Sequence, residues 1–297
     1  MNDADRAAGI DEIVDVVLDA APEIRGLQTD NRGGTLDRSN PTGDDIIAAD
    51  DAADELLVDR LAAIEAVGTV ASEERADVVD AGDGLSVTVD PLDGSSNLSA
   101  NAPTGTIVGV ADAPLPAPGR EFVAAVLICY GPVTTAYVAI DGEGVTEYEI
   151  PPSGDGGTNP APRVSDAAVE IPSEPTVYGV GGGDDDWPPV VAGIVESLRD
   201  ELKLRYGGAL VADVSQMLTK GGLFAYPQLQ SRPAGKLRYQ FEVAPVALVV
   251  EEAGGASTDG TGSLLDRPAT ELHDRSPIYV GNRSLIDRVD SAFADAA

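Results

Sequence analysis

Cysteine, histidine, tryptophan and lysine are scarce in this chain. The single cysteine, Cys129, cannot form a disulfide within the chain, and its place in the apolar run FVAAVLICY indicates a core residue rather than a redox centre. That run is the longest apolar stretch, and it is too short for a membrane span, which needs roughly 20 residues. The acidic beginning MNDADRAAGIDE lacks the apolar segment of a secretory signal. We therefore expect a cytoplasmic protein that does not contact a membrane.

The deficit of basic residues is equally informative. Lys and Arg together number 19 against 51 Asp and Glu, which gives a formal net charge of −32 at pH 7. Such a charge excludes nucleic acid as a partner, because binding to nucleic acid needs a basic surface. The acidic residues are spread along the chain, which favours adaptation of the whole surface to high salt. A dedicated cation-binding or acidic interaction protein is the alternative. The lone histidine, His273, lies in the polar stretch TELHDRS and is expected to be solvated.

Apolar periodicity predicts an α+β first half, in which two helices pack against a largely antiparallel sheet. The hairpin expected in the last strand segment turns near Gly131 and Pro132. The predicted elements are helices at 8–20 and 44–67, a polar loop between them at 28–43, and strands at 85–90, 105–111 and 122–140.

A stretch rich in Pro, Gly, Ser and Asp, residues 151–175, is typical of a linker or an exposed excursion. Strands and helices alternate beyond it, which indicates an α/β second half. We therefore predict an α/β protein with two domains, 1–165 and 166–297. The predicted elements of the second half are strands at 176–180, 222–227 and 277–281, and helices at 188–200, 211–220, 241–255 and 284–294.

The stretch VDPLDGSSNL combines possible ligands for a metal with possible donors for a phosphate. Asp90 ends a strand that Pro91 prevents from continuing as a regular ladder. A turn from Asp90 to Asp93 can bring both carboxylates and the Leu92 carbonyl to one point, and hard divalent cations prefer such oxygen ligands. The residues at 94–97, Gly-Ser-Ser-Asn, can open a helix whose N–H groups bind a phosphate. On the residue pattern alone, an ordinary turn is an equal alternative.

The same stretch resembles the signature of the inositol-monophosphatase and fructose-bisphosphatase superfamily of metal-dependent, lithium-sensitive phosphatases. Its Leu-Asp-Gly-Ser-Ser-Asn form is similar to the class I fructose-1,6-bisphosphatase branch. This resemblance implies a layered α-β-α-β-α fold and hydrolysis of the 1-phosphate of fructose 1,6-bisphosphate to fructose 6-phosphate and phosphate, a step of gluconeogenesis. Four further blocks resemble the family in the same order, at 40–50 (NPTGDDIIAAD), 72–74 (SEE), 205–227 and 235–255.

The resemblance implies an active site with two or three Mg²⁺ ions. Several carboxylates packed together raise each other's pKa unless cations neutralise them, so this arrangement is physically sensible. Asp50 and Glu74 would orient and deprotonate the attacking water, and Asp44 would complete the site when its loop closes. The implied metal ligands are Glu73, Glu74, Asp90, the Leu92 carbonyl, Asp93 and Glu242.

The resemblance also implies a binding site for a small sugar phosphate. One of its arginines would reach into the site of a neighbouring subunit, which implies a homo-oligomer, a dimer or tetramer. Without a role in binding, Tyr226 would be a core aromatic residue and Arg205 an ordinary surface residue, and these alternatives stay open. The implied residues are Gly94, Ser95, Ser96 and Asn97 around the 1-phosphate, and Arg205, Tyr206, Tyr226 and Lys236 around the sugar and 6-phosphate.

Two segments depart from the family pattern. VGVGGGDDDWPP stands where the family has Asn-Glu-Gly-Tyr in the 6-phosphate pocket, and it places three aspartates, 184–186, near a dianionic group. Gly84 and Leu85 replace a Lys-Tyr pair that helps to bind AMP in regulated members, so we expect no AMP inhibition there. Substrate preference therefore stays open. Sedoheptulose 1,7-bisphosphate and inositol monophosphate are alternative substrates, and a non-catalytic acidic cation-binding protein is the alternative outside the fold.

Overall fold

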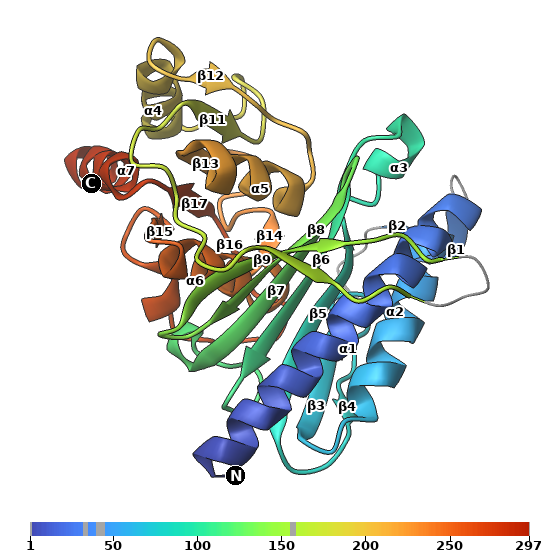
Figure 1. The fold of residues 1–297 in the computed structure, drawn as a ribbon. Helices are drawn as coiled ribbons and strands as arrows, with labels where there is room; N and C mark the ends of the chain where they lie inside the picture. The colour runs from blue at the N-terminus through green and yellow to red at the C-terminus, as the bar shows by residue number, and fades with distance from the viewer. Residues whose placement is uncertain (1, 32–34, 40–44, 155–158, 297) are drawn as a thin grey trace.

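The computed structural model describes residues 2–31, 35–39, 45–154 and 159–296 and contains two large sheets with helices packed on them (Figure 1). The first half contributes α1 (Asp3–Asp30), β1 (Thr35–Ser39), β2 (Asp45–Ile47), α2 (Ala48–Ala62), β3 (Val67–Ser72), β4 (Val79–Asp80), β5 (Leu85–Asp93), α3 (Asn97–Ala100), β6 (Thr104–Ala111), η1 (Gly119–Glu121), β7 (Phe122–Tyr130), β8 (Thr134–Ile140), β9 (Gly144–Ile150) and β10 (Arg163–Asp166).

The second half contributes the other sheet and its helices. Its elements are β11 (Val177–Val180), α4 (Pro189–Arg199), β12 (Lys203–Leu204), α5 (Leu210–Lys220), β13 (Gly222–Tyr226), β14 (Leu237–Arg238), η2 (Tyr239–Val243), α6 (Ala244–Glu252), β15 (Ala256–Thr258), η3 (Leu264–Asp266), β16 (Arg275–Ser276), β17 (Ile278–Gly281) and α7 (Arg283–Ala296).

The elements stack in five layers. The eight-stranded sheet has the order β10-β9-β8-β7-β6-β5-β3-β4, and the five-stranded sheet has the order β12-β11-β13-β17-β15. One core packs α1 and α2 on one face of the larger sheet, a second encloses α5 and α6 between the sheets, and a third packs α4 and α7 on the outer face of the smaller sheet (Figure 1). The α/β class and the α-β-α-β-α order are therefore confirmed. The division at residue 165 stays a prediction, because the middle core takes side chains from both halves.

The helix expected at 44–67 is shorter than predicted. It begins at Ala48, and Asp45–Ile47 forms β2 instead. At its other end, Val67 already belongs to β3, a buried strand that the sequence analysis missed. Alanine-rich and β-branched stretches follow one another here, so apolar spacing could not separate the helix from the strand. By contrast, α1 is longer than the predicted 8–20 and contains Pro22.

The strand β5 continues through Pro91 rather than ending at Asp90. Asp90 pairs with Ile107 and Asp93 pairs with Gly105, and the register between the two pairs shifts. Proline lacks an N–H donor, and this irregularity lets the strand pass it while the ladder resumes beyond. Both aspartates are consequently held by a sheet and not by a free turn.

Three smaller predictions have clear outcomes. Cys129 is 9% exposed and lies in the middle core, as expected. The hairpin of β7 and β8 around Gly131 is confirmed by its antiparallel register. His273 was expected to be solvated, but it is partly buried, and its ring centre lies 5.2 Å from that of Phe241.

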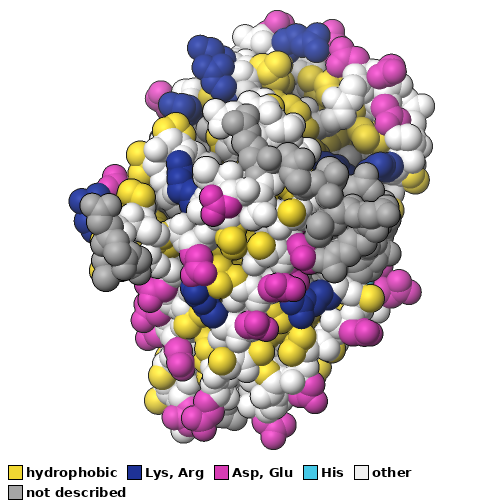
Figure 2. Space-filling view, turned by 90° about the vertical axis from the view of Figure 1, so that its right-hand side faces the viewer, with side chains coloured by type: hydrophobic (Ala, Val, Ile, Leu, Met, Phe, Trp, Pro, Cys, Tyr) yellow, Lys and Arg dark blue, Asp and Glu magenta, His cyan; other side chains and the backbone are white. Residues whose placement is uncertain are grey.

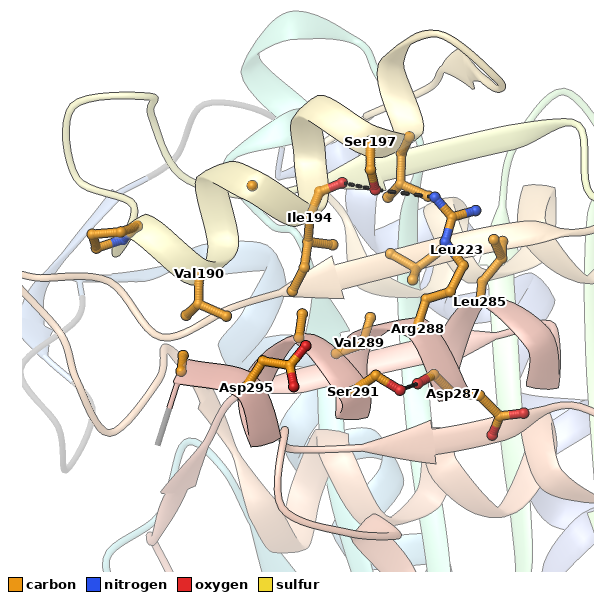
Figure 3. Close-up of a pocket in the computed structure, with 15 residues that line it drawn as sticks. Val190, Ile194, Ser197, Leu223, Leu285, Asp287, Arg288, Val289, Ser291 and Asp295 are labelled. Carbon is orange, nitrogen blue, oxygen red and sulfur yellow. Dashed lines mark hydrogen bonds between the residues drawn. The ribbon is translucent and has the colours of Figure 1, made fainter.

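The surface carries many carboxylates, and Figure 2 shows them spread over the visible face rather than gathered in one patch. None of the helices in the described part of the chain has both the length and the apolar character that crossing a bilayer requires. A groove of about 650 Å³ lies between α4 and α7, where apolar side chains such as Ile194 and Val289 face each other (Figure 3). None of the predicted site residues lines this groove.

Candidate active site

Most of the predicted site residues meet in one cavity of about 280 Å³. They come from the ends of strands in both sheets, from α2 and from η2, so residues far apart in sequence share one polar wall. The predicted residues that line the cavity are Asp50, Glu73, Glu74, Asp90, Leu92, Asp93, Gly94, Ser95, Ser96, Tyr226, Lys236 and Glu242. Asp44 lies outside the described residues.

Parallel pairing of β3 and β5 brings Glu73 and Glu74, which follow β3, beside Asp90 in β5. Ser72 lies opposite Val89, so the residues after β3 come beside Asp90. The Glu73 N–H donates to the Val89 carbonyl at 2.9 Å and extends this pairing. An ion pair of 2.7 Å between Arg75 and Asp54 then ties the turn after β3 to α2.

Asp93 lies at the amino end of α5. Its two carboxylate oxygens accept the N–H groups of Leu210 and Val211 at 3.0 and 2.7 Å. A carboxylate is favoured there by the helix dipole and by the unpaired N–H groups of the first turn. On the same helix, Asp213 accepts the N–H groups of Gly207 and Gly208 at 2.7 and 3.1 Å and fixes the turn before α5.

Glu242 projects from η2, a short π-helix that the sequence analysis merged with α6. One of its oxygens accepts the Arg238 N–H at 2.5 Å. The Arg238 side chain is almost fully buried and forms an ion pair with Glu73. Arg238 therefore stands inside the carboxylate cluster, and π-helical turns often occur at such functional positions.

The cluster has strongly perturbed carboxyl groups. Burial, and then repulsion from Asp93, Glu242 and other carboxylates, raises the pKa of Asp90 well above its usual range. Burial also raises the pKa of Glu242 to about 7 and that of Asp50 to about 7, although each accepts a backbone N–H that lowers it. A metal-free protein at neutral pH thus carries protons in this cavity that it would release if a cation entered.

The residues fit a hard divalent cation. One oxygen each from Glu73, Asp90 and Glu242 lie within 4.8 Å of one another. Oxygen atoms of Asp50 (Oδ1) and Glu73 (Oε2) are buried without a hydrogen-bond partner among the described residues. Buried acceptors without partners are costly, and carboxylate oxygens are the ligands that Mg²⁺ prefers. This donor set can therefore hold magnesium.

The Gly94–Ser96 turn follows directly on β5 and lines the same cavity. Gly94 has φ +69°, and a Cβ there would lie 2.5 Å from the Ala209 Cβ. The N–H groups of Ser95 and Ser96 donate to no described residue, so they are available for an anion. Asn97 is different, because its side-chain amide donates to the Pro103 and Gly207 carbonyls, both at 2.9 Å. Its expected role as a phosphate ligand is not favoured by this geometry.

The sugar-side residues are only partly assembled. The Tyr206 hydroxyl donates to the Tyr226 hydroxyl at 3.1 Å, and the Lys236 ammonium lies 5.2 Å from the Tyr226 ring centre. Tyr226 and Lys236 line the cavity, whereas Tyr206 reaches it only through Tyr226. Arg205 is exposed and does not line the cavity of its own chain.

Three arginines in the cavity wall were missed by the sequence analysis. They are Arg232, Arg238 and Arg275, and they add positive charge to a pocket otherwise rich in acid. The only available signal was composition, since arginine supplies nearly all basic residues of this chain. Nothing in the local pattern distinguishes them from surface arginines.

Comparison with known proteins shows which family has this fold. The family model described as Fructose-1-6-bisphosphatase, N-terminal domain, matches residues 21–155, and that of the C-terminal domain matches residues 171–294. A class 1 fructose-1,6-bisphosphatase of Halobacterium salinarum is 50% identical over 289 residues, 96% of this chain and 98% of that protein.

Two solved structures have the same architecture. The Leishmania major fructose-1,6-bisphosphatase in holo form has a TM-score of 0.87 and 28% identity, and the match covers 99% of this chain and 96% of that one. A putative sedoheptulose-1,7-bisphosphatase from Toxoplasma gondii has a TM-score of 0.84 and 28% identity, with 96% and 94% covered. The fold and the carboxylate-lined cavity are those of a phosphatase. This chain belongs to the class 1 fructose-1,6-bisphosphatase family.

Proposed function

We propose that this chain hydrolyses fructose 1,6-bisphosphate to fructose 6-phosphate and inorganic phosphate, with Mg²⁺ as cofactor. The observation that supports this most is the union, in one cavity, of buried carboxylates of raised pKa with the Gly94–Ser96 turn. The first can hold cations, and the second offers N–H donors for a phosphate. Family membership supports the same reaction and substrate.

Mg²⁺ bound by this set would polarise the phosphate and ease ionisation of a water molecule. We assign Glu73, Glu74, Asp90, Asp93 and Glu242, with the Leu92 carbonyl, as its ligands for two or three ions. The N–H groups of the turn at 94–96 hold the 1-phosphate, while Asp50 and Glu74 orient the water.

The chain's own groups then move one proton. Asp50 accepts the proton of the water that attacks phosphorus, which its burial at the entry to α2 suits it to do. The bond from phosphorus to the sugar oxygen breaks, that oxygen takes a proton from solvent water as it leaves, and Asp50 then returns its own proton to solvent. The nearby Arg238 side chain offsets the negative charge that gathers on the phosphate. The expected closure by Asp44 stays a prediction.

The location, the oligomeric state and the salt requirement of the enzyme are also proposed here. We propose a cytoplasmic homo-oligomer in which Arg205 contacts the site of a second copy. Exposed apolar side chains on both sides of Arg205, Leu204 (57% exposed) and Tyr206 (45%), support a contact surface there. The sparse lysine and dispersed acid support function in high salt.

A substrate panel in molar KCl tests the proposed function. With Mg²⁺, kcat/KM for fructose 1,6-bisphosphate is expected to exceed that for inositol 1-phosphate by about 100-fold or more, since two anchored phosphates bind better than one. Sedoheptulose 1,7-bisphosphate is the informative competitor. Excess EDTA should abolish phosphate release. Mg²⁺ uptake without release from any substrate would instead support the cation-binding alternative.

Magnesium binding is expected to release protons at neutral pH. Because the metal-free pKa of Asp50 and that of Glu242 lie at about 7, ions entering at pH 6.5 must displace protons, and apparent affinity should fall as pH decreases. Calorimetry in two buffers of different ionisation enthalpy measures this release. Equal heats in both buffers would contradict it.

The same shifts give a stability prediction. A carboxyl whose pKa is higher in the folded state than in the unfolded chain favours folding at low pH, and that contribution is lost as pH rises through about 7. The metal-free protein should therefore lose Tm between pH 5 and 8. The rise in Tm on adding Mg²⁺ should be larger at pH 8 than at pH 6.

A further inference from the structure

The segment Gly181–Trp187 lacks any cationic or amide side chain that could bind a second phosphate. Its residues are Gly, Asp and Trp, and the Trp187 indole N–H is already used, donating to the Gly181 carbonyl at 2.9 Å. A bisphosphate substrate must nevertheless place a second dianion in the cavity. The positive charge for that group has to come from another element.

Two of the three aspartates of this segment make contacts away from the cavity. The Asp186 carboxylate accepts the Ser231 N–H at 2.8 Å and also the Ser231 hydroxyl. The Asp186 carbonyl accepts the Gln230 N–H at 2.8 Å. Asp184 lies 3.9 Å from Arg199, outside the cavity. Asp186 therefore holds the loop 228–235 in place.

That loop presents Arg232 to the cavity. The Arg232 N–H donates to the Leu229 carbonyl at 3.0 Å, and the Arg232 carbonyl accepts the N–H groups of Leu229 and Gly235 at 3.1 and 3.0 Å. The backbone of Arg232 is thus fixed on both sides. Its guanidinium forms no hydrogen bond or ion pair with any residue of the described part of the chain.

Three other cations line this cavity. Arg238 forms an ion pair with Glu73, the Arg275 guanidinium donates to the Lys236 carbonyl, and the Lys236 ammonium lies 5.2 Å from the Tyr226 ring centre. Arg232, by contrast, lines the same cavity with an exposed side chain. The four cations are therefore not equivalent, and Arg232 is the arginine whose guanidinium is not held by a described residue.

We propose that Arg232 binds the phosphate of the substrate that is not hydrolysed, and that Asp186 is a positioning residue that holds this arginine through Ser231. This inference rests on the proposed function. The planar guanidinium can make two hydrogen bonds to a phosphate, which gives the site its preference for bisphosphates over monophosphates.

Kinetics with two substrates test the assignment. In Arg232→Gln, KM for fructose 1,6-bisphosphate should rise by about 10- to 100-fold with kcat within about twofold, because one charge-assisted contact is lost in ground and transition states alike. The kcat/KM for fructose 1-phosphate, which lacks the second phosphate, should stay unchanged. Arg163→Gln, an exposed arginine on β10, is the control for the same change in net charge. An unchanged substrate ratio in Arg232→Gln would overturn the proposal.

A binding measurement separates this inference from the reaction. Fructose 6-phosphate should bind Arg232→Gln more weakly than wild type by about the same factor, while inorganic phosphate binds both equally. If wild type hydrolyses neither substrate with Mg²⁺, the proposed function fails, and fructose 6-phosphate binding still tests Arg232. Equal fructose 6-phosphate affinity in both proteins would refute its role.

The positioning role of Asp186 has its own signature. Asp186→Asn should lower the bisphosphate-to-monophosphate ratio by a smaller factor, and its effect should vanish in the Arg232→Gln background. A purely structural role would instead lower Tm and reduce activity on both substrates alike, in either background.

Discussion

Asp90→Asn is expected to reduce kcat/KM for fructose 1,6-bisphosphate by about 100- to 1,000-fold while raising the Tm of the metal-free protein. Asparagine has nearly the same shape and can keep the hydrogen bond that Oδ1 accepts from the Leu92 N–H at 3.1 Å. It removes the negative charge that repels Asp93, Glu242, Glu74 and Asp50. Function and metal-free stability should therefore move in opposite directions.

Activity, calorimetric Mg²⁺ binding and thermal unfolding in EDTA at pH 8 measure this outcome. Asp59→Asn is the matched control, because Asp59 is exposed on α2 and the change in net charge is the same. The control should leave all three quantities nearly unchanged. Loss of activity together with a lower Tm in EDTA would contradict this prediction. It would mean that Asp90 stabilises the metal-free fold instead of destabilising it by repelling the other carboxylates.

Such opposed effects follow from how the cavity is built. A pocket that gathers five or more carboxylates destabilises the folded chain unless cations neutralise them, and active sites often carry this cost. Here the cost is partly offset without metal, by Arg238 beside Glu73 and by the α5 N–H groups on Asp93. Part of the repulsion is consequently offset before any ion binds.

The sequence predicted the meeting of the carboxylates but not the way in which they meet. Asp90 and Asp93 were recognised from their spacing and from the residues after them, and they do line one cavity. The expectation of a free turn was wrong, because a break at Pro91 is visible in sequence while the pairing of β5 with β6 beyond it depends on another strand. Strand pairing is a long-range property that a local pattern does not contain.

The missed arginines illustrate the same limit. Arg238 and Arg232 differ completely in burial, the first almost fully buried and the second exposed, although only five residues separate them. Burial of an arginine depends on the carboxylates that surround it, and these come from distant segments. Conversely, helical and strand periodicities are local, so they could predict an α+β first half and an α/β second half, while the order of the layers was predicted from the family resemblance.

Substitution of Gly94 is the second change with a large expected effect. Gly94 has φ +69°, which costs other residues about 1–2 kcal/mol, and a Cβ there would lie 2.5 Å from the Ala209 Cβ and 2.9 Å from its Cα. Gly94→Ala should therefore displace the turn that holds the 1-phosphate. We expect kcat/KM to fall by about 100-fold or more, as a shift near 1 Å suffices for that, and stability to fall by about 2–5 kcal/mol.

Gly142 supplies a control that separates backbone strain from the clash. It has φ +76° in the turn between β8 and β9, and a Cβ there would meet nothing within 4 Å. Gly142→Ala should cost about 1–2 kcal/mol in denaturant unfolding and leave kinetics unchanged. The difference between the two variants isolates the contact with Ala209, which belongs to the turn entering α5. If Gly94→Ala matched Gly142→Ala in both kinetics and stability, the close approach of the phosphate turn to α5 would have no part in shaping the site.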